Sequence, residues 1–314
     1  MTRTAVLIPC YNEEAAIAKT VGDFRVVLPH AQIYVYDNNS RDRTVEVARQ
    51  AGAIVRSEPL QGKGNVVRRM FADIEADVYV LVDGDSTYDA ASAPKMIAAL
   101  RRDSLDMVNG SRVTNIQKAY RPGHRFGNWL LTGMVAWIFG SRFSDMLSGY
   151  RVMSRRYVKS FPALSAGFET ETELTVHALE LRMPIAEIAT PYKDRPEGSV
   201  SKLSTFKDGF RILWTIIVLV KEERPMQFFS LFALFLAAIS TFLIVPIVLH
   251  YLHTGLVPRL PTAVLSMGLM ILGFLSLACG LILDTVTRGR REMKRMRYLN
   301  IPAPEMVSDS TQQE

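Results

Sequence analysis

Two long stretches near the C-terminal end of the sequence lack Asp, Glu, Lys and Arg altogether. The first lies between Arg224 and Arg259, and the second lies between Arg259 and Asp284. A helix needs about 20 apolar residues to cross the core of a bilayer, and both stretches reach that length. Buried helices of a large soluble core are the alternative, but the first stretch is apolar on nearly all of its faces. We therefore expect transmembrane helices at residues 226–252 and 262–287.

Cysteine is scarce, with two residues in the whole chain. Cys10 ends a predicted core strand, and Cys279 lies inside the second apolar stretch. The two are therefore not expected to form a disulfide, and the scarcity of cysteine is consistent with a reducing compartment. The apolar run that ends at Pro9 is too short for the core of a signal peptide, and the acidic Glu13 and Glu14 follow it at once. The N-terminal part is therefore expected to stay in the cytoplasm.

Positive charge exceeds negative charge, and the net charge is +6 at pH 7. Lys221 and Arg224 precede the first apolar stretch, and basic residues cluster at 288–297 after the second, whereas the loop at 253–261 carries only Arg259. The positive-inside rule then places both termini in the cytoplasm and the loop outside. Membrane lipids explain this basic charge, so we expect no nucleic-acid partner.

From residue 4 to about residue 110, short apolar runs alternate with helical segments. Strands are predicted at 5–9, 33–36, 53–56, 78–82 and 107–109, with a later strand at 185–188. Alternation at this spacing is typical of βαβ units in a mostly parallel sheet. Ligands bind outside the carboxyl ends of such strands. Polar residues gather at those ends, in Tyr11-Asn12-Glu13, Asp37-Asn38-Asn39-Ser40, Asp83-Gly84-Asp85 and Gly110-Ser111-Arg112.

Two segments between the sheet and the apolar stretches have the pattern of interfacial helices. The segment at about 124–142 mixes aromatic and apolar residues with basic ends, and that at about 203–222 runs directly into the first stretch. For the first of them, an ordinary core-facing helix is the alternative. Residues 1–222 are thus predicted to form one cytoplasmic α/β domain, and 288–314 a basic and then disordered tail.

Asp83 and Asp85 follow an apolar strand with one glycine, Gly84, between them. Neighbouring carboxylates repel each other unless a positive group lies between them. A divalent cation such as Mg²⁺, which bridges carboxylates and substrate phosphates, would meet that need. An acidic surface turn is the alternative, because Asp-Gly is a common turn pair. A calcium loop of the EF-hand type is excluded, because Tyr88 stands where its glycine should be.

Gly62-Lys63-Gly64 places flexible backbone and one cation together, which suggests a loop near a phosphate. A flexible turn is the alternative. The segment is not a P-loop, because Ser57 stands at the first glycine position and Gly64 follows Lys63 directly.

These motifs occur in a fixed order, together with Ile8-Pro9-Cys10-Tyr11-Asn12-Glu13-Glu14 at the start. Together they resemble the family 2 glycosyltransferases, which have the GT-A fold. Later motifs are similar to the dolichol-phosphate mannosyltransferase branch and its bacterial polyprenyl-phosphate relatives: Gly110-Ser111-Arg112, Asp145 to Arg151, Gly167-Phe168-Glu169, and Asp194-Arg195 through Ser201-Lys202. The resemblance covers about residues 4 to 222, and bacterial members also carry two C-terminal spans.

The resemblance implies roles for individual residues. Donor contacts would come from Pro9, Tyr11, Glu13, Asp37, Lys63, Asp83, Gly84, Asp85, Arg195 and Lys202. Asp83 and Asp85 would also bind the metal, Mg²⁺ or Mn²⁺. Arg112 and Arg125 would bind the acceptor phosphate, and Asp145 is a further candidate for the catalytic site.

The reaction implied is inverting transfer of one sugar, from a UDP- or GDP-linked donor, to undecaprenyl or dolichyl phosphate at the cytoplasmic membrane face. Transfer of a single sugar is expected because the Gln-x-x-Arg-Trp motif of processive synthases is absent. Two departures affect the donor. The chain has Asp37-Asn38-Asn39-Ser40 where the family usually has Asp-Asp-Gly-Ser, and Thr87 replaces a glutamine that the mannosyltransferases often have.

Several alternatives stay open. The acceptor could instead be a protein, a glycan or a glycerolipid, or the chain could bind nucleotide sugars without catalysis. A homo-oligomer is also possible. Asp145 could cap a turn rather than act in catalysis. Glu169, Glu171 and Glu173 could form a solvated first helical turn, where acidic residues suit the helix dipole.

A phosphate acceptor would change what the site must supply. A hydroxyl acceptor loses a proton as it attacks and needs a positioned base. A phosphate monoester, with a second pKa near 6, is already largely ionised at neutral pH. We therefore expect Asp145 not to be an essential base.

Overall fold

The computed structural model describes residues 2–113, 144–164, 169–193 and 217–303, with Gly133, Trp137, Gly167 and Trp214 as isolated positions. The chain forms two compact units, one of residues 1–212 with 294–314 and one of residues 213–293. Arg125, Arg195 and Lys202 lie outside the described residues, as do most of the predicted interfacial helices.

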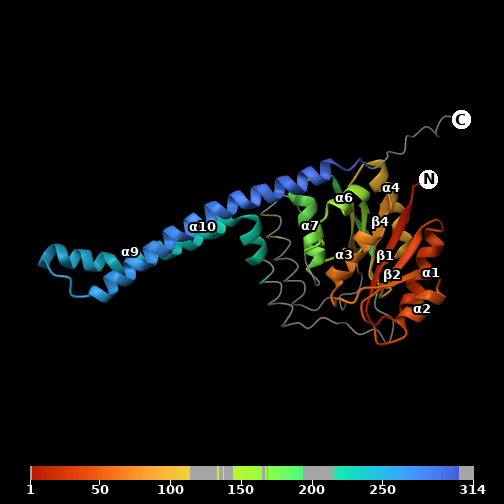
Figure 1. The fold of residues 1–314 in the computed structure, drawn as a ribbon, viewed down its shortest axis with the longest axis horizontal. Coiled ribbons are helices and arrows are strands. Elements are labelled where there is room, and N and C mark those ends of the chain that lie inside the picture. Colours follow the sequence, from red (N-terminus) through yellow and green to blue (C-terminus); the bar gives the residue numbers. More distant parts are fainter. Residues whose placement is uncertain are drawn as a thin grey trace. The chain divides into compact units, whose positions relative to one another are not determined.

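The first unit is built on a seven-stranded sheet with the order β3-β2-β1-β4-β6-β5-β7. Figure 1 labels β1 between its neighbours β2 and β4. Its strands are β1 (Thr4–Cys10), β2 (Gln32–Asp37), β3 (Ile54–Ser57), β4 (Val78–Leu81), β5 (Met107–Val113), β6 (Arg151–Ser154) and β7 (Ile185–Pro191). Strand β6 runs antiparallel to both of its neighbours, β4 and β5, and the other pairs are parallel. The expectation of a mostly parallel sheet is confirmed.

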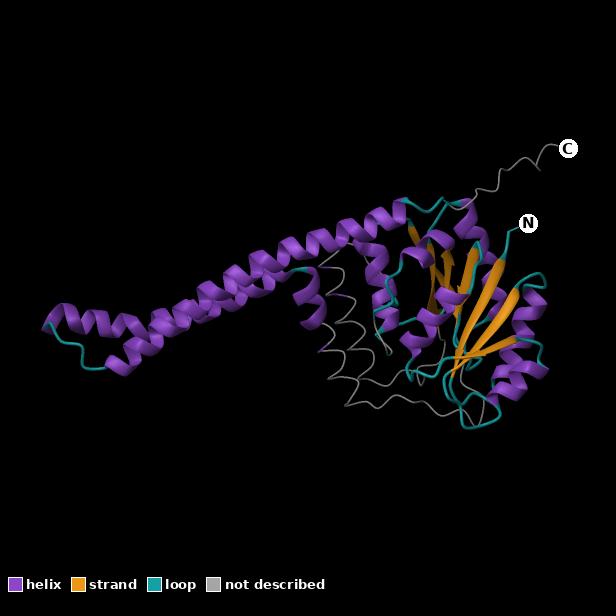
Figure 2. Ribbon diagram, viewed as in Figure 1, coloured by secondary structure: helices purple, strands orange, loops and turns teal. Residues whose placement is uncertain are grey.

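Helices cover both faces of this sheet (Figure 2). They are α1 (Ile17–Val27), α2 (Thr44–Gln50), α3 (Lys63–Asp73), α4 (Ala93–Arg102), α6 (Arg155–Ser160) and α7 (Thr170–Glu180), with a short 3₁₀ helix at Ala90–Ser92. Val6, Ile8 and Val80 pack with residues of α1, α2 and α4 in one buried core. Strands buried on both faces are apolar without alternation, which is why β1 and β4 are recognisable in the sequence.

The second unit contains most of two long helices, α9 (Pro225–Thr254) and α10 (Leu260–Leu299), at the positions of the expected spans. Within the described residues, these two are long and apolar enough to cross a membrane, with mean hydropathies of 2.7 and 2.2. Ser240 and Ser266 join them by reciprocal hydrogen bonds, each hydroxyl donating to the other residue's carbonyl, at 2.8 and 2.9 Å. Small residues and such polar pairs are typical of contacts between membrane helices.

Helix α10 does not end with the apolar stretch but continues through the basic segment to Leu299. Its last residues belong to the first unit. The Tyr298 hydroxyl donates to the buried carboxylate of Asp106 at 2.7 Å, and Lys294 pairs with Glu180 at 2.6 Å. The Arg156 guanidinium also reaches Asp106 and lies 4.4 Å from the Tyr298 ring centroid. These contacts fasten the end of α10 to the sheet domain.

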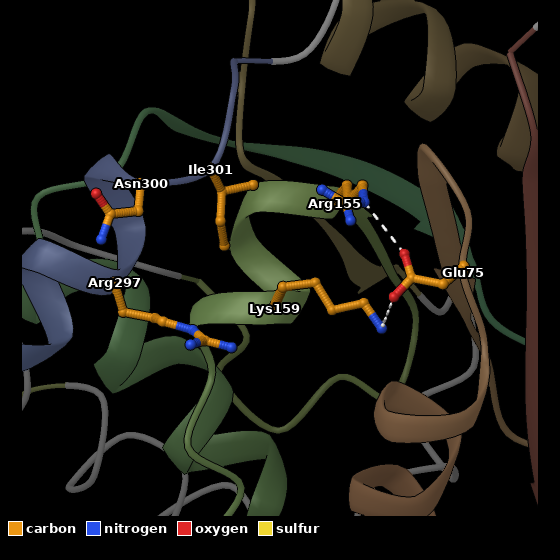
Figure 3. A pocket seen from close by; sticks show the side chains of 6 residues that line it. All are labelled: Glu75, Arg155, Lys159, Arg297, Asn300 and Ile301. Carbon is orange, nitrogen blue, oxygen red and sulfur yellow. Dashed lines mark hydrogen bonds and ion pairs between the residues drawn. The ribbon is translucent and has the colours of Figure 1, made fainter.

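A pocket of about 290 Å³ lies beside this end of α10 (Figure 3). It is lined by Glu75, Arg155, Lys159, Arg297, Asn300 and Ile301. Glu75 bridges Arg155 and Lys159, at 3.2 and 2.8 Å. Because Glu75 precedes β4, the pocket lies at the amino end of that strand, away from Asp83 and Asp85.

Candidate active site

The carboxyl ends of β1, β2 and β4 meet at one edge of the sheet, because these strands are parallel neighbours. Cys10 pairs with Asp37 in the register of β1 and β2, so Tyr11 and the segment after Asp37 leave the sheet side by side. Asp83 follows β4 at the same edge. The motifs that were predicted to converge therefore do so, as the rule for open α/β sheets requires.

Glycine between the two aspartates leaves room for the side chains of β1 and α1. A Cβ atom on Gly84 would lie 2.6 Å from the Cys10 sulfur, closer than packed atoms approach. Asp85 is 4 % exposed, and its Oδ1 accepts hydrogen bonds from the Thr87 hydroxyl at 2.6 Å and the Thr87 amide at 3.2 Å. Thr87, in the position that mannosyltransferases often give to glutamine, thus orients one of the two carboxylates.

Asp83 contacts a cation of the protein itself. The Lys63 ammonium, at the first residue of α3, lies 2.5 Å from Asp83 Oδ1 and 2.5 Å from Glu171 Oε1. The charges of Asp83 and Glu171 raise the pKa of Lys63 and outweigh the effect of burial, which would lower it. Lys63 is therefore a permanent cation at this edge. On the other side, a Cβ atom on Gly149 would collide with the Asp83 carboxylate, so this glycine leaves space for it.

The two aspartates suit a hard divalent cation that arrives together with phosphate ligands. No group of three or more His, Cys, Asp or Glu side chains that could enclose a metal exists among the described residues. Mg²⁺ commonly binds through one or two carboxylates plus substrate phosphates and waters, rather than in a cage made wholly of protein. Asp83 and Asp85 provide that number of carboxylates, and phosphate oxygens and waters would complete the coordination.

The loop after β2 is fixed by Asn38, one of the departures from the usual family sequence. Its side-chain amide donates to the Glu58 and Leu60 carbonyls, both at 2.8 Å, and its side-chain oxygen accepts from the Gly62 amide at 2.7 Å. Asn38 is 4 % exposed. Its side chain therefore serves to attach the Gly62-Lys63 turn to the end of β2.

The loop after β1 is tied to the loop after β2. The Asn12 amide donates to the Ser40 hydroxyl at 2.8 Å, and the Glu13 amide donates to the Thr44 hydroxyl at 2.9 Å. Glu13 and Asp37 are both buried, at 9 % and 6 % exposed, whereas Pro9 and Tyr11 are half-buried. These four predicted donor contacts are thus brought together at the ends of β1 and β2 and on the loop after β1.

Arg112, at the end of β5, pairs with Asp145 through two hydrogen bonds. The Nε–Oδ2 distance is 2.6 Å and the Nη2–Oδ1 distance is 2.8 Å. Asp145 is buried, and its backbone carbonyl accepts from the Asn109 side chain at 2.8 Å. The guanidinium carbon also lies 5.6 Å from the ring centroid of Tyr192. Arg112 is therefore held in one orientation by a carboxylate and an aromatic ring.

The sequence did not reveal the roles of Glu171 and Arg151. A solvated first turn of a helix was one of the alternatives for Glu171, and its 7 % exposure contradicts that alternative. The fully buried Arg151 guanidinium donates to the carbonyls of Met146, Ser148 and Glu171. Burial lowers the pKa of Arg151. The location of Arg151 at the end of the Asp145–Arg151 motif was the available signal, but its partners are distant in the sequence.

A solved structure identifies the class of fold. The glucosyl-3-phosphoglycerate synthase of Mycobacterium tuberculosis, in complex with Mn²⁺, uridine diphosphate and glucosyl-3-phosphoglycerate, covers 70 % of this chain. The match spans 79 % of that chain with a TM-score of 0.58 and 21 % identity. At this identity the likeness concerns the fold, which is the expected GT-A type.

Relatives in sequence show the family. The profile of glycosyl transferase family 2 matches residues 5–160. Glycosyltransferase AglJ of Haloferax volcanii is 32 % identical over 301 residues, which are 94 % of this chain and 97 % of that protein. A dolichyl-phosphate hexose transferase of the same organism is 29 % identical over 221 residues, 70 % of this chain and 95 % of that protein. The chain belongs to glycosyltransferase family 2.

Proposed function

We propose that this protein transfers one sugar from a nucleotide-sugar donor to a polyprenyl phosphate at the cytoplasmic membrane face. The orientation of Arg112 carries the proposal, because this guanidinium is fixed by Asp145 at the same sheet edge as the paired aspartates. A guanidinium can grip phosphate oxygens in pairs. The similarity to a dolichyl-phosphate hexose transferase and the two long apolar helices support the same acceptor.

In the proposed reaction, an oxygen of the acceptor phosphate forms a bond to the anomeric carbon of the donor sugar. The bond from that carbon to the diphosphate breaks, and the electron pair leaves with the nucleoside diphosphate. Attack from the opposite face inverts the anomeric centre. A bound divalent cation supplies stabilisation of negative charge on the leaving diphosphate.

The side chains of the site have separate tasks in this scheme. Arg112, together with Arg125, binds the acceptor phosphate and offsets its repulsion from the donor. Asp83 and Asp85 hold the cation, and Lys63, Arg195 and Lys202 bind donor phosphate. Pro9, Tyr11, Glu13 and Asp37 hold the base and ribose. Gly84, between the two aspartates, also contacts the donor. No proton has to be removed from the ionised phosphate, so Asp145 orients Arg112 instead of acting as a base.

A turnover assay tests this function directly. The full chain is purified in detergent and supplied with Mg²⁺ or Mn²⁺, undecaprenyl phosphate and a panel of UDP- and GDP-linked sugars. We expect one sugar to be added from one of these donors. A protein, glycan or diacylglycerol offered as acceptor should receive none. Equal transfer to undecaprenol, which lacks the phosphate, would refute the mechanism.

The topology is part of the proposal, with residues 1–222 and 288–314 in the cytoplasm and the loop between α9 and α10 outside. It rests on the basic residues that follow the second apolar stretch. Leu256→Cys places a thiol in that loop, and Ser310→Cys places one in the C-terminal tail. An impermeant thiol reagent added to intact cells should label the first variant and leave the second unlabelled. Labelling of the tail from outside would contradict the two-span arrangement.

A further inference from the structure

One buried ammonium, that of Lys63, is shared by two carboxylates of unequal exposure. The Lys63 side chain is 11 % exposed and that of Glu171 is 9 % exposed, whereas that of Asp83 is 31 % exposed. Asp83 lies in the run that we assign to the metal, and Glu171 lies in the first turn of α7, outside every motif given to the donor or acceptor. Lys63 therefore links the metal site to a carboxylate with no assigned role.

Lys63 and a divalent cation bound at Asp83 would share one carboxylate. The ammonium contacts Asp83 Oδ1, and Mg²⁺ binds carboxylate oxygens at about 2.0–2.1 Å. Two cations on one carboxylate would lie only a few ångströms apart and repel each other. Lys63 must therefore move away from Asp83 when the cation binds, and a buried ammonium left without any partner is strongly disfavoured.

Glu171 can keep the Lys63 ammonium paired after it leaves Asp83. Its second oxygen, Oε2, is buried and has no hydrogen-bond partner within the described residues, so the carboxylate can accept another N–H of the ammonium. Its main chain is held in turn by the Arg151 guanidinium, which donates to the Glu171 carbonyl at 2.8 Å. The main chain of Glu171 is thus held where its carboxylate contacts Lys63.

We propose that Glu171 is a positioning residue, which retains Lys63 beside the site when a divalent cation displaces it from Asp83. The inference rests on the proposed function for the identity of the donor, whose diphosphate would then receive the displaced ammonium. Cation and diphosphate should accordingly bind with positive coupling, because the diphosphate draws Lys63 away from Asp83.

Binding of Mn²⁺ to the full chain in detergent, followed by the paramagnetic resonance of free Mn²⁺, tests this without turnover. In the absence of nucleotide, Lys63→Met should raise the affinity for Mn²⁺ by roughly 5- to 150-fold, the usual range for coupled sites. Glu171→Gln should lower it, because Lys63 then has Asp83 as its remaining partner. In a Lys63→Met background, Glu171→Gln should have no further effect, because Glu171 acts through Lys63.

Glu173→Gln is the matched control. It removes a carboxylate from the same turn of α7, and that carboxylate accepts from the Leu164 amide at 2.8 Å. This variant should bind Mn²⁺ as the unchanged protein does. Repeating the titrations with UDP and with GDP should show coupling between nucleotide and Mn²⁺ that Lys63→Met weakens. Near-ultraviolet circular dichroism verifies the fold, and Glu171→Asp replaces Glu171→Gln if the latter fails to fold.

Unchanged Mn²⁺ affinity in Glu171→Gln would overturn the inference. The inference would also be overturned if Glu171→Gln weakened Mn²⁺ binding equally in the unchanged protein and in the Lys63→Met background. Glu171 would then bind the metal directly. A protein that shows the expected Mn²⁺ pattern but transfers no sugar in the turnover assay would contradict the proposed function and leave the role of Glu171 intact. If the full chain transfers sugar but the variants bind Mn²⁺ as the unchanged protein does, the proposed function is supported and the role of Glu171 is overturned.

Discussion

Asp145 presents both of its carboxylate oxygens to the guanidinium of Arg112, and it does so from a buried position. A general base needs an oxygen that can reach the acceptor and take its proton. Here the two oxygens already accept charge-assisted hydrogen bonds, and Oδ2 also receives the Arg112 backbone amide at 3.3 Å. The pair is an orienting device, in which the carboxylate fixes the direction of the guanidinium.

Asp145→Asn should therefore impair acceptor binding without removing the chemistry. Loss of one charge-assisted hydrogen bond costs about 1.5–3 kcal/mol, so we expect the acceptor KM to rise roughly 10- to 100-fold. The donor KM and the pH dependence of kcat should stay unchanged. Steady-state kinetics with undecaprenyl phosphate between pH 6 and 9 measure all three quantities. A drop of kcat by several orders of magnitude, together with an altered pH profile, would show that Asp145 is a base after all.

Removal of the metal should abolish transfer. Asp85→Asn keeps the shape of the side chain and its contact with Thr87 but takes away one ligand charge, so most activity should disappear while thermal stability is retained. Asp103→Asn, which removes an exposed carboxylate paired with Arg102, serves as control. EDTA should abolish the transfer activity of the unchanged protein, and added Mg²⁺ or Mn²⁺ should restore that activity. Full turnover in EDTA would exclude the assigned role of Asp83 and Asp85.

The sequence could predict the sheet edge because the information is local. The central strands β1 and β4 are continuous apolar runs, and the residue after a parallel strand must emerge at the edge where the other parallel strands end. Asp37 and Asp83 could be placed together on that basis alone. Strand β6 was not predicted, because it is short and begins with the charged residue Arg151, which is nevertheless fully buried.

The features of the site that the sequence did not predict depend on contacts between segments that are distant in the sequence. Glu171 and Lys63 are 108 positions apart, and no local sequence pattern predicts their ion pair. Acidic residues in the first turn of a helix suit the helix dipole, which is why a solvated position was an alternative for Glu171. Packing of α7 against Lys63 and Arg151 overrides that preference. Arg125, Arg195 and Lys202, whose roles came from the resemblance, stay predictions.

Asn38 should contribute more to the free energy of unfolding than its neighbour Asn39. Asn38→Ala leaves the Glu58 and Leu60 carbonyls and the Gly62 amide without their partner, and one unsatisfied buried group costs about 1–3 kcal/mol. We expect the free energy of unfolding to fall by about 2–3 kcal/mol. Asn39, with φ of 65°, is exposed, and glycine tolerates this conformation, so Asn39→Gly should have a small effect. Denaturant titration of the detergent-solubilised chain compares the two, and equal losses would contradict the structural role of Asn38.

His177 should make the fold sensitive to acid. Burial, with a smaller effect from the charge of Lys294, lowers the pKa of His177 from 6.5 to about 3. Its Nε2 lies 3.1 Å from the Ser160 hydroxyl, and Nδ1 is buried without a hydrogen-bond partner among the described residues. Between pH 6.5 and 3 the unfolded chain therefore binds a proton at this residue that the folded chain does not. Since stability rises with pH wherever the unfolded state binds more protons, the contribution of His177 is lost as the pH falls.

His177→Gln isolates this contribution, because the other titrating groups cancel when the variant is compared with the unchanged protein. The free energy of unfolding of the unchanged protein should fall more steeply below pH 6.5, and the difference should approach about 1.4 kcal/mol per pH unit. Denaturant titrations at several pH values between 7.5 and 4.5 measure it. His30→Gln, at an exposed position, should leave the pH dependence unaltered. Parallel curves for the unchanged protein and His177→Gln would mean that His177 accepts its proton as readily in the folded chain as in the unfolded one.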